Sequence, residues 1–315
     1  MCSLSIILQV FAPTTPDSIF SWRRFRHSGC PSALRSGFTL IELLIAVSII
    51  AILIALLLPT LAMARRDAQS VVCASNLRQF GVAYTEYFAE ESAHGLPYDP
   101  NLPTMYWLEL LGPYFTNQTP AAQNLSSPSF VPASEQAALV CPSTPNQTLT
   151  AGAAGYGDAF TTWGPVAWWN QPTITSHFGS YCMNGWLFDT SITATPADPN
   201  PMYWYTFHQR LGLQPYFSYG SQLPGPQTPV FADAIWADAW PDSSDQPPQA
   251  PFTLNTGYPT GAPSGPGGLG RLCIDRHGLA INVSFEDGHV ALTSLPQLWM
   301  LPWSATSSPR QVSIP

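Results

Sequence analysis

The stretch of sequence that decides the fold is FTLIELLIAVSIIAILIALLLPTL, which occupies residues 38–61. Its only charged residue is Glu42, and it is longer than the ~20 apolar residues that a helix needs to cross a bilayer. Such a stretch occurs once in the chain, so it predicts a single membrane-spanning helix. The 315 residues of the chain leave ample length after it for one or two folded domains.

Positive charge gathers before this stretch, and negative charge prevails after it. Four arginines precede residue 38, opposed only by Asp17, whereas the chain from Arg65 onward is acidic. Positively charged flanks stay on the cytoplasmic side of a membrane. We therefore expect a cytoplasmic N-terminus and a main body outside the cytoplasm. The four arginines are Arg23, Arg24, Arg26 and Arg35.

Three interpretations of the apolar stretch compete. The first is a signal anchor, and the second is a secretory signal peptide, since Ala62-Met63-Ala64 offers an A-x-A cleavage site. Signal peptides use only roughly 7–15 apolar residues, however. Neither interpretation explains Glu42, because a charged side chain in the middle of a membrane costs on the order of 2.5–3.5 kcal/mol. The third interpretation comes from the residues around Glu42.

The nine residues Ser36–Leu44 read SGFTLIELL. They resemble the cleavage and methylation signal of type IV prepilins and type II secretion pseudopilins. The resemblance implies a membrane peptidase that cuts between Gly37 and Phe38 and methylates Phe38, so that residues 1–37 are a leader. In a filament of packed apolar helices, the Glu42 carboxylate would then neutralise the N-terminal ammonium of a neighbouring subunit, because a buried charge is tolerable when it is paired.

The leader of 37 residues is long for this family. Its first part, Met1–Cys30, resembles no working part of a prepilin leader. Either the true start codon lies further down the sequence or the leader has an extension. Both possibilities stay open.

The helix is predicted to continue beyond the membrane. Residues 62–91 contain no proline, and apolar residues recur there at helical spacing. We expect one helix over about residues 38–91, roughly 80 Å long at 1.5 Å per residue. Its apolar half, 38–61, serves the membrane and assembly, whereas its amphipathic half, 62–92, needs a partner surface from the globular head, 93–315. The apolar positions are Cys73, Leu77, Phe80, Tyr84, Tyr87 and Phe88.

Two further phrases resemble a more specific group, the H-X9-DG prepilin-type proteins. Residues 73–79 read CASNLRQ, and nine residues separate His277 from Asp287-Gly288. The resemblance implies a pilin-like α+β fold, in which one long N-terminal helix packs on an antiparallel β-sheet head with long loops. Elsewhere in the head the sequence predicts a short helix and a strand, at residues 107–111 and 228–233.

The signature itself predicts a β-hairpin over residues 277–294. Asp-Gly is favoured at the centre of a type I′ turn, where both residues need positive φ. A two-residue loop of this kind pairs Val283 with Leu292 and places both on one face with Ile281. We expect that face to be the surface on which the helix packs.

Four cysteines follow the predicted leader. An even number of cysteines in an exported chain indicates disulfides, and four of them allow three pairings. Cys141 lies in the phrase LVCPS, which is common in the H-X9-DG group, and the resemblance favours a Cys73–Cys141 disulfide. Cys182 and Cys273 would remain as the second pair. The alternative is a set of free, buried thiols.

A metal site is a second interpretation of the acidic and histidine residues in the head. His, Asp and His form an acceptable zinc set, and some of the pseudopilins that this chain resembles have a calcium-stabilised C-terminal loop. A hairpin turn explains the Asp-Gly pair without a metal, however, so we expect no cofactor and place calcium ahead of zinc. The candidate ligands are His277, Asp287 and His289 for zinc, and Asp233, Asp238 and Asp242 for calcium.

Composition argues against other functions. Only 10% of the residues are charged, against a usual ~25%, and the net charge is −8. The chain lacks the basic surface that phosphate contacts need, so we expect no nucleic-acid partner. It contains no GxSxG, HExxH or Walker motif, and we expect no enzyme activity.

Five tryptophans of the head could form an aromatic platform for sugars, although tryptophans more often fill a core. They are Trp163, Trp168, Trp169, Trp236 and Trp240.

Two functional hypotheses follow. The first is a prepilin-like structural subunit of a type II secretion-like pseudopilus or a type IV pilus-like filament, whose partners are the prepilin peptidase, other pilin or pseudopilin subunits and the inner membrane. The alternative is a membrane-anchored binding module that does not polymerise and uses its aromatic face on glycans. Both hypotheses place a single pass in the inner membrane and the head in the periplasm or at the cell surface.

Overall fold

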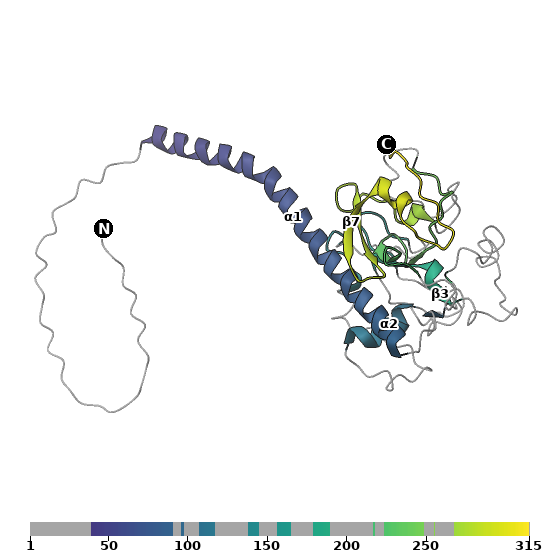
Figure 1. Ribbon diagram of the computed structural model, residues 1–315. Helices are drawn as coiled ribbons and strands as arrows, with labels where there is room; N and C mark the ends of the chain where they lie inside the picture. Colours follow the sequence, from purple (N-terminus) through teal and green to yellow (C-terminus); the bar gives the residue numbers. More distant parts are fainter. Residues whose placement is uncertain are drawn as a thin grey trace, which may run out of the picture. The chain divides into compact units, whose positions relative to one another are not determined.

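The structure is a computed structural model (Figure 1), and it describes residues 39–90, 96–97, 107–116, 138–144, 156–164, 179–189, 217, 224–248, 255 and 268–314. The chain divides into two units, Met1–Ile54 and Ala55–Pro315. In chain order its elements are α1 (Leu40–Glu90), β1 (Leu96–Pro97), α2 (Trp107–Thr116), β2 (Tyr181–Asn184), the 3-10 helix η3 (Gly185–Leu187), β3 (Phe188–Asp189), β4 (Pro229–Asp233), β5 (Asp238–Ala239), η4 (Leu269–Arg271), β6 (Ala280–Phe285), β7 (Val290–Ser294) and η5 (Leu295–Met300).

Helix α1 runs for 51 residues, which confirms the long helix predicted from the sequence. Pro59 lies inside it and has no N–H to donate to the carbonyl of Ala55, four residues earlier. The division between the two units falls in this same turn. The predicted apolar stripe of the second half is buried: its members are Cys73, Leu77, Phe80, Tyr84 and Tyr87, with Phe88 partly buried against the core.

The head contains a five-stranded sheet in the order β5-β2-β4-β6-β7. Neighbouring strands are antiparallel except for the edge strand β5, which runs parallel to β2. The α+β prediction is therefore confirmed, and the sheet is mixed rather than purely antiparallel. The predicted strand at residues 228–233 is β4, and the predicted short helix at 107–111 is the start of α2.

Aromatic side chains join the second half of α1 to the sheet. The ring of Phe80 lies 5.4 Å from that of Tyr181 in β2, 5.7 Å from that of Phe231 in β4 and 5.9 Å from that of Trp107 in α2, measured between centroids. Tyr84, one helical turn later, makes an edge-to-face contact with Phe231. Tilted and edge-to-face pairs of this kind add to the stabilisation from apolar burial, so the head does supply a partner surface for the helix stripe.

The β6–β7 hairpin is present, but its turn differs from the prediction. Only the glycine of the Asp-Gly pair has positive φ, at 83°, and the backbone N–H of Phe285 donates to His289 O. This is a three-residue loop with glycine in the left-handed position rather than a type I′ turn. Val283 therefore pairs with Ala291 and not with Leu292. Because a shift of one residue moves a side chain to the other face, Leu292 leaves the Val283 face and is 54% exposed.

Helix α1 also packs on the face of β6 opposite to the one predicted. Successive side chains of a strand alternate between faces, and the side chain that contacts α1 is Asn282, whose Nδ2 donates to the carbonyl of Ser70 at 3.3 Å. The amide of Asn76 similarly donates to the hydroxyl of Tyr181 at 3.1 Å. Every residue of β6 is buried, so Ile281 packs into the core without facing the helix.

Candidate functional site

The predicted assembly residue Glu42 caps the start of α1. Its Oε2 accepts hydrogen bonds from the backbone N–H of Thr39 at 2.9 Å and from the Thr39 hydroxyl at 2.8 Å, and its own N–H donates to that hydroxyl at 3.3 Å. This reciprocal arrangement is a capping box, which satisfies N–H groups at a helix start. Glu42 thus has a structural role within the single chain. The predicted processing residues Gly37 and Phe38 lie outside the described residues.

The first half of α1 exposes its apolar side chains. Every residue from Thr39 to Ala68 is exposed. Within this half lies a window of mean hydropathy 3.1, long enough to cross a bilayer, and none of it is buried. A soluble protein rarely leaves a contiguous apolar surface of this size uncovered. This half of the helix is therefore consistent with a single-pass membrane anchor.

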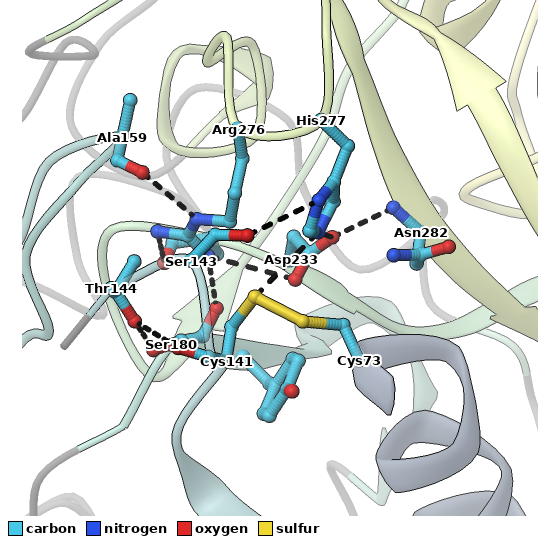
Figure 2. A network of polar contacts seen from close by, with 12 residues as sticks. Cys73, Cys141, Ser143, Thr144, Ala159, Ser180, Asp233, Arg276, His277 and Asn282 are labelled. Atoms are coloured by element: carbon cyan, nitrogen blue, oxygen red, sulfur yellow. Dashed lines mark hydrogen bonds and ion pairs between the residues drawn. A yellow bond between two sulfur atoms is a disulfide. The ribbon is translucent and has the colours of Figure 1, made fainter. Parts of the chain in front are cut away.

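A buried polar cluster connects α1, the end of β4 and the segment before β6 (Figure 2). Its central residue is Asp233, which is wholly buried. Oδ2 of Asp233 accepts a hydrogen bond from the backbone N–H of Asn282 at 2.7 Å and lies 3.2 Å from Nε2 of His277. Oδ1 lies 3.7 Å from the guanidinium of Arg276. These partners offset the cost of removing the carboxylate from water.

Arg276 fastens this cluster to the surrounding backbone. Its guanidinium donates to the carbonyls of Ser180 at 2.5 Å, Asp158 at 2.9 Å and Ala234 at 3.1 Å. Its Nε also donates to the carbonyl of Ala159 at 3.4 Å. Burial lowers the pKa of Arg276, and the nearby Asp233 charge opposes that change. Since arginine stays protonated in proteins, one buried cation holds three separate segments together.

The other side of the cluster is a disulfide. Cys73 of α1 is bonded to Cys141, with their Cα atoms 5.2 Å apart, which confirms the first predicted pair. Nε2 of His277 lies 3.6 Å from Sγ of Cys141, and Nδ1 lies 3.5 Å from the hydroxyl of Ser143. Nε2 of His277 thus lies close to both the disulfide and the Asp233 carboxylate (Figure 2).

The second predicted disulfide does not form. Cys182 and Cys273 are free and buried. Burial raises the pKa of both thiols, to about 12 for Cys273, so both remain protonated and unreactive at neutral pH. Their pairing had been inferred because they remained after the first pair, and an even cysteine count gives no information about distances.

The two halves of the H-X9-DG signature lie at opposite ends of β6. His277 precedes the strand and belongs to the buried cluster, whereas Asp287 follows it in the exposed turn. A strand of six residues at ~3.3 Å per residue spans roughly 20 Å, so the zinc set of His277, Asp287 and His289 is not brought together. Asp287 instead pairs with His289, and these hydrogen bonds lower the pKa of Asp287.

The three predicted calcium ligands have separate partners. Asp238 forms a buried ion pair with Arg271 at 2.5 Å. Asp242 accepts hydrogen bonds from the backbone N–H and the hydroxyl of Ser244 in a turn, and Asp233 belongs to the cluster described above. Within the part of the chain that the structure describes, these carboxylates do not form a group around one point.

The described tryptophans of the predicted aromatic face belong to the core. Trp163 is 1% exposed and Trp240 is 5% exposed, and Trp236 is partly buried against the same core. Trp168 and Trp169 lie outside the described residues. The three described rings therefore offer no open platform for a sugar.

Two features of these sites were not predicted from the sequence. The capping box at Thr39 and Glu42 has a recognisable signal, since threonine followed three residues later by glutamate is typical of a helix start. The network around Arg276 and Asn282 has no such signal, because its partners are backbone groups and side chains from distant segments.

Comparison with known proteins supports the interpretation of the N-terminal segment. Residues 33–58 match the family described as the prokaryotic N-terminal methylation motif. This match does not extend to the H-X9-DG phrases. Searches of the curated proteins and of the solved structures gave no match. The chain thus carries the N-terminal methylation motif of prepilin-type proteins, which overlaps the start of a long helix, and this helix and an α+β head have a pilin-like arrangement.

Proposed function

We propose that this protein is a prepilin-like structural subunit of a type IV pilus-like or type II secretion-like filament. The observation that carries the proposal is a methylation motif at residues 33–58 that includes the start of a helix with an exposed, apolar first half. A prepilin peptidase cuts between Gly37 and Phe38 and methylates Phe38. The inner membrane holds residues 38–61 before assembly, and the head lies outside the cytoplasm.

Assembly follows from the physical chemistry of this helix. Packing the exposed apolar side chains of many copies together removes them from lipid and water, and buried apolar surface stabilises by roughly 25 cal/mol per Å² where water is displaced. Glu42 is the only charged side chain among residues 38–61, so among packed helices it needs a cationic partner. The N-terminal ammonium of a neighbouring Phe38 supplies that partner and sets the stagger between subunits. Subunits of this kind have structural roles, and we expect no catalytic activity.

The capping box gives Glu42 a second role, which the test must separate from charge pairing. Glu42→Gln keeps an oxygen that can accept the capping hydrogen bonds but removes the charge, whereas Glu42→Ala removes both. We expect both variants to be inserted and cleaved, and neither to enter filaments. The measurement is the fraction of chain in sheared filaments relative to the membrane fraction. Asp67→Asn, which changes another exposed carboxylate of α1, is the control and should assemble normally.

A Glu42→Gln variant that assembles like the parent would contradict the charge-pairing role and assign Glu42 to helix capping alone. Normal assembly of both variants would contradict the whole assembly model. If the protein never enters filaments, it is the alternative, a membrane-anchored binding module.

The processing step has its own measurement. We expect mass spectrometry of protein from its native membrane to find N-methylated Phe38 as the first residue. A first residue near Arg65 would instead indicate a secretory signal peptide, and an intact leader would indicate a plain anchor. Either result would contradict the proposal.

A further inference from the structure

The cluster around Asp233 brings together four side chains of the types that bind metal ions. One ligand atom from each of Cys73, Cys141, Asp233 and His277 lies within 4.8 Å of the other three, and all four residues are buried. Cys73 belongs to the amphipathic half of α1, and the other three belong to the head. None of the four lies in the apolar half of α1, so the following inference does not depend on filament assembly. We propose that these four side chains bind one zinc ion when the Cys73–Cys141 disulfide is reduced.

The distances from Nε2 of His277 to two of the other ligand atoms already fit a zinc site. Tetrahedral zinc with bonds of ~2.3 Å to sulfur and ~2.0–2.2 Å to nitrogen and oxygen places its ligand atoms roughly 3.3–3.8 Å apart. Nε2 of His277 lies 3.6 Å from Sγ of Cys141 and 3.2 Å from Oδ2 of Asp233. Zinc binding also needs the two sulfur atoms to separate, which reduction of their bond permits, and all four ligand atoms already lie within 4.8 Å of one another.

The ligands are held in place by groups around them. The hydroxyl of Ser143, 3.5 Å from Nδ1 of His277, can accept a hydrogen bond from that nitrogen, which leaves the lone pair of Nε2 free for a metal. Asp233 is fixed by the backbone N–H of Asn282 at 2.7 Å. Its Oδ1 is buried and accepts no hydrogen bond from the described residues, so the carboxylate retains unused acceptor capacity at this point (Figure 2).

Charge is balanced in both states. With the disulfide formed, the Asp233 carboxylate faces the Arg276 guanidinium at 3.7 Å, and the pair is neutral. With zinc bound, the two positive charges of the ion are matched by two thiolates, and Asp233 and Arg276 still cancel each other. Neither state buries a net charge, which is the condition that makes ionic groups tolerable away from water.

The redox step is a thiol–disulfide exchange with a dithiol reductant. The bond between the two sulfur atoms breaks, a disulfide forms in the reductant, and Cys73 and Cys141 each gain a hydrogen. Zinc then displaces two protons from the thiols to solvent. Exchange with a disulfide oxidant reverses both steps: the Cys73–Cys141 bond forms again, the oxidant is reduced to a dithiol that takes up two protons, and the zinc ion is released. Cys73 and Cys141 are thus joined by a disulfide under oxidising conditions and by a shared zinc ion under reducing conditions.

The test uses the full chain in detergent micelles, oxidised or reduced with a dithiol that is then removed. We expect metal analysis to find one zinc per reduced chain and none per oxidised chain. Substitution with Co²⁺ should give the sulfur-to-metal charge-transfer band and the visible bands of tetrahedral coordination. A reduced protein that binds no zinc, or whose cobalt spectrum lacks the sulfur band, would overturn the proposal.

Variants identify the ligands. His277→Ala should weaken zinc binding at least tenfold, whereas the control Cys273→Ser, which changes another buried thiol outside the cluster, should bind like the parent. Ser143→Ala removes the hydroxyl that lies next to Nδ1 of His277. Because the side chain of Ser143 is partly exposed, this variant tests the site without disturbing the core. We expect a smaller loss of affinity there. Unchanged affinity in both His277→Ala and Ser143→Ala would contradict the proposed site.

Discussion

Among single residues, Arg276 makes contacts that predict a large effect of substitution. Arg276→Met removes the hydrogen bonds to four carbonyls and leaves Asp233 as a buried charge without its cation. Breaking a buried pair by removing one partner costs roughly 3–5 kcal/mol of unfolding free energy. Chemical denaturation in micelles, followed by tryptophan fluorescence, measures the loss. Arg78→Met, at an exposed position of α1, should change stability by less than ~0.5 kcal/mol, and equal losses in the two variants would contradict the role of Arg276.

The burial of Glu286 predicts that the free energy of unfolding depends on pH. Burial raises its pKa from 4.5 to about 7, and its Oε2 has no hydrogen-bond partner among the described residues. A carboxyl group whose pKa is higher in the folded state binds its proton more tightly there. The contribution of Glu286 to the free energy of unfolding is therefore fully present below about pH 4.5 and is lost as the pH rises through 7.

Glu286→Gln removes this titration. We expect the variant and the parent to have similar unfolding free energies near pH 4, and the variant to be more stable by on the order of 2 kcal/mol near pH 8. Denaturation curves collected between these two pH values measure the difference. A difference that stays constant with pH would show that Glu286 is not buried in its neutral form.

At the scale of elements, alanine substitutions at two glycines measure the effect of backbone conformation on stability without an effect of packing. A Cβ added to Gly288 or to Gly81 would meet nothing within 4 Å. Gly288→Ala should destabilise by about 1 kcal/mol, because its φ of 83° is unfavourable for an L-residue. Gly81→Ala lies within α1 and should stabilise by up to about 1 kcal/mol. Denaturation of both variants gives the two signs, and effects of the same sign would contradict the assigned conformations.

The elements were more predictable from the sequence than their contacts. Helix α1 and its stripe followed from periodicity, and β4 from a short apolar run, because these signals are local. The turn after Phe285 was wrong by one residue, since Asp-Gly suits both a type I′ turn and a loop with glycine alone in the left-handed conformation. That single residue decides which face of the hairpin each side chain occupies. The cluster around Asp233 could not be predicted, because its partners come from segments far apart in the chain.

For the whole molecule, the disulfide is the main covalent constraint. Cys73 and Cys141 are separated by 68 residues, and the chain-entropy estimate for closing such a loop is roughly 4 kcal/mol. Reduction in the presence of a chelator should lower the unfolding free energy by about this amount. The double variant Cys73→Ala/Cys141→Ala should show a similar loss and no response to the reductant. An unchanged free energy on reduction would contradict this stabilising role.

The same bond also determines how the chain responds to mechanical load. Tension applied between α1 and the C-terminus passes from Cys73 to Cys141 through the sulfur atoms, so the segment between them bears none of it. At ~3.3–3.6 Å per extended residue, the 68-residue separation corresponds to roughly 230 Å of contour length that stays slack while the bond is intact. Under load, the oxidised molecule therefore extends less than the reduced one. When the disulfide is reduced, the segment between the two cysteines can also unfold and adds its contour length to the extension.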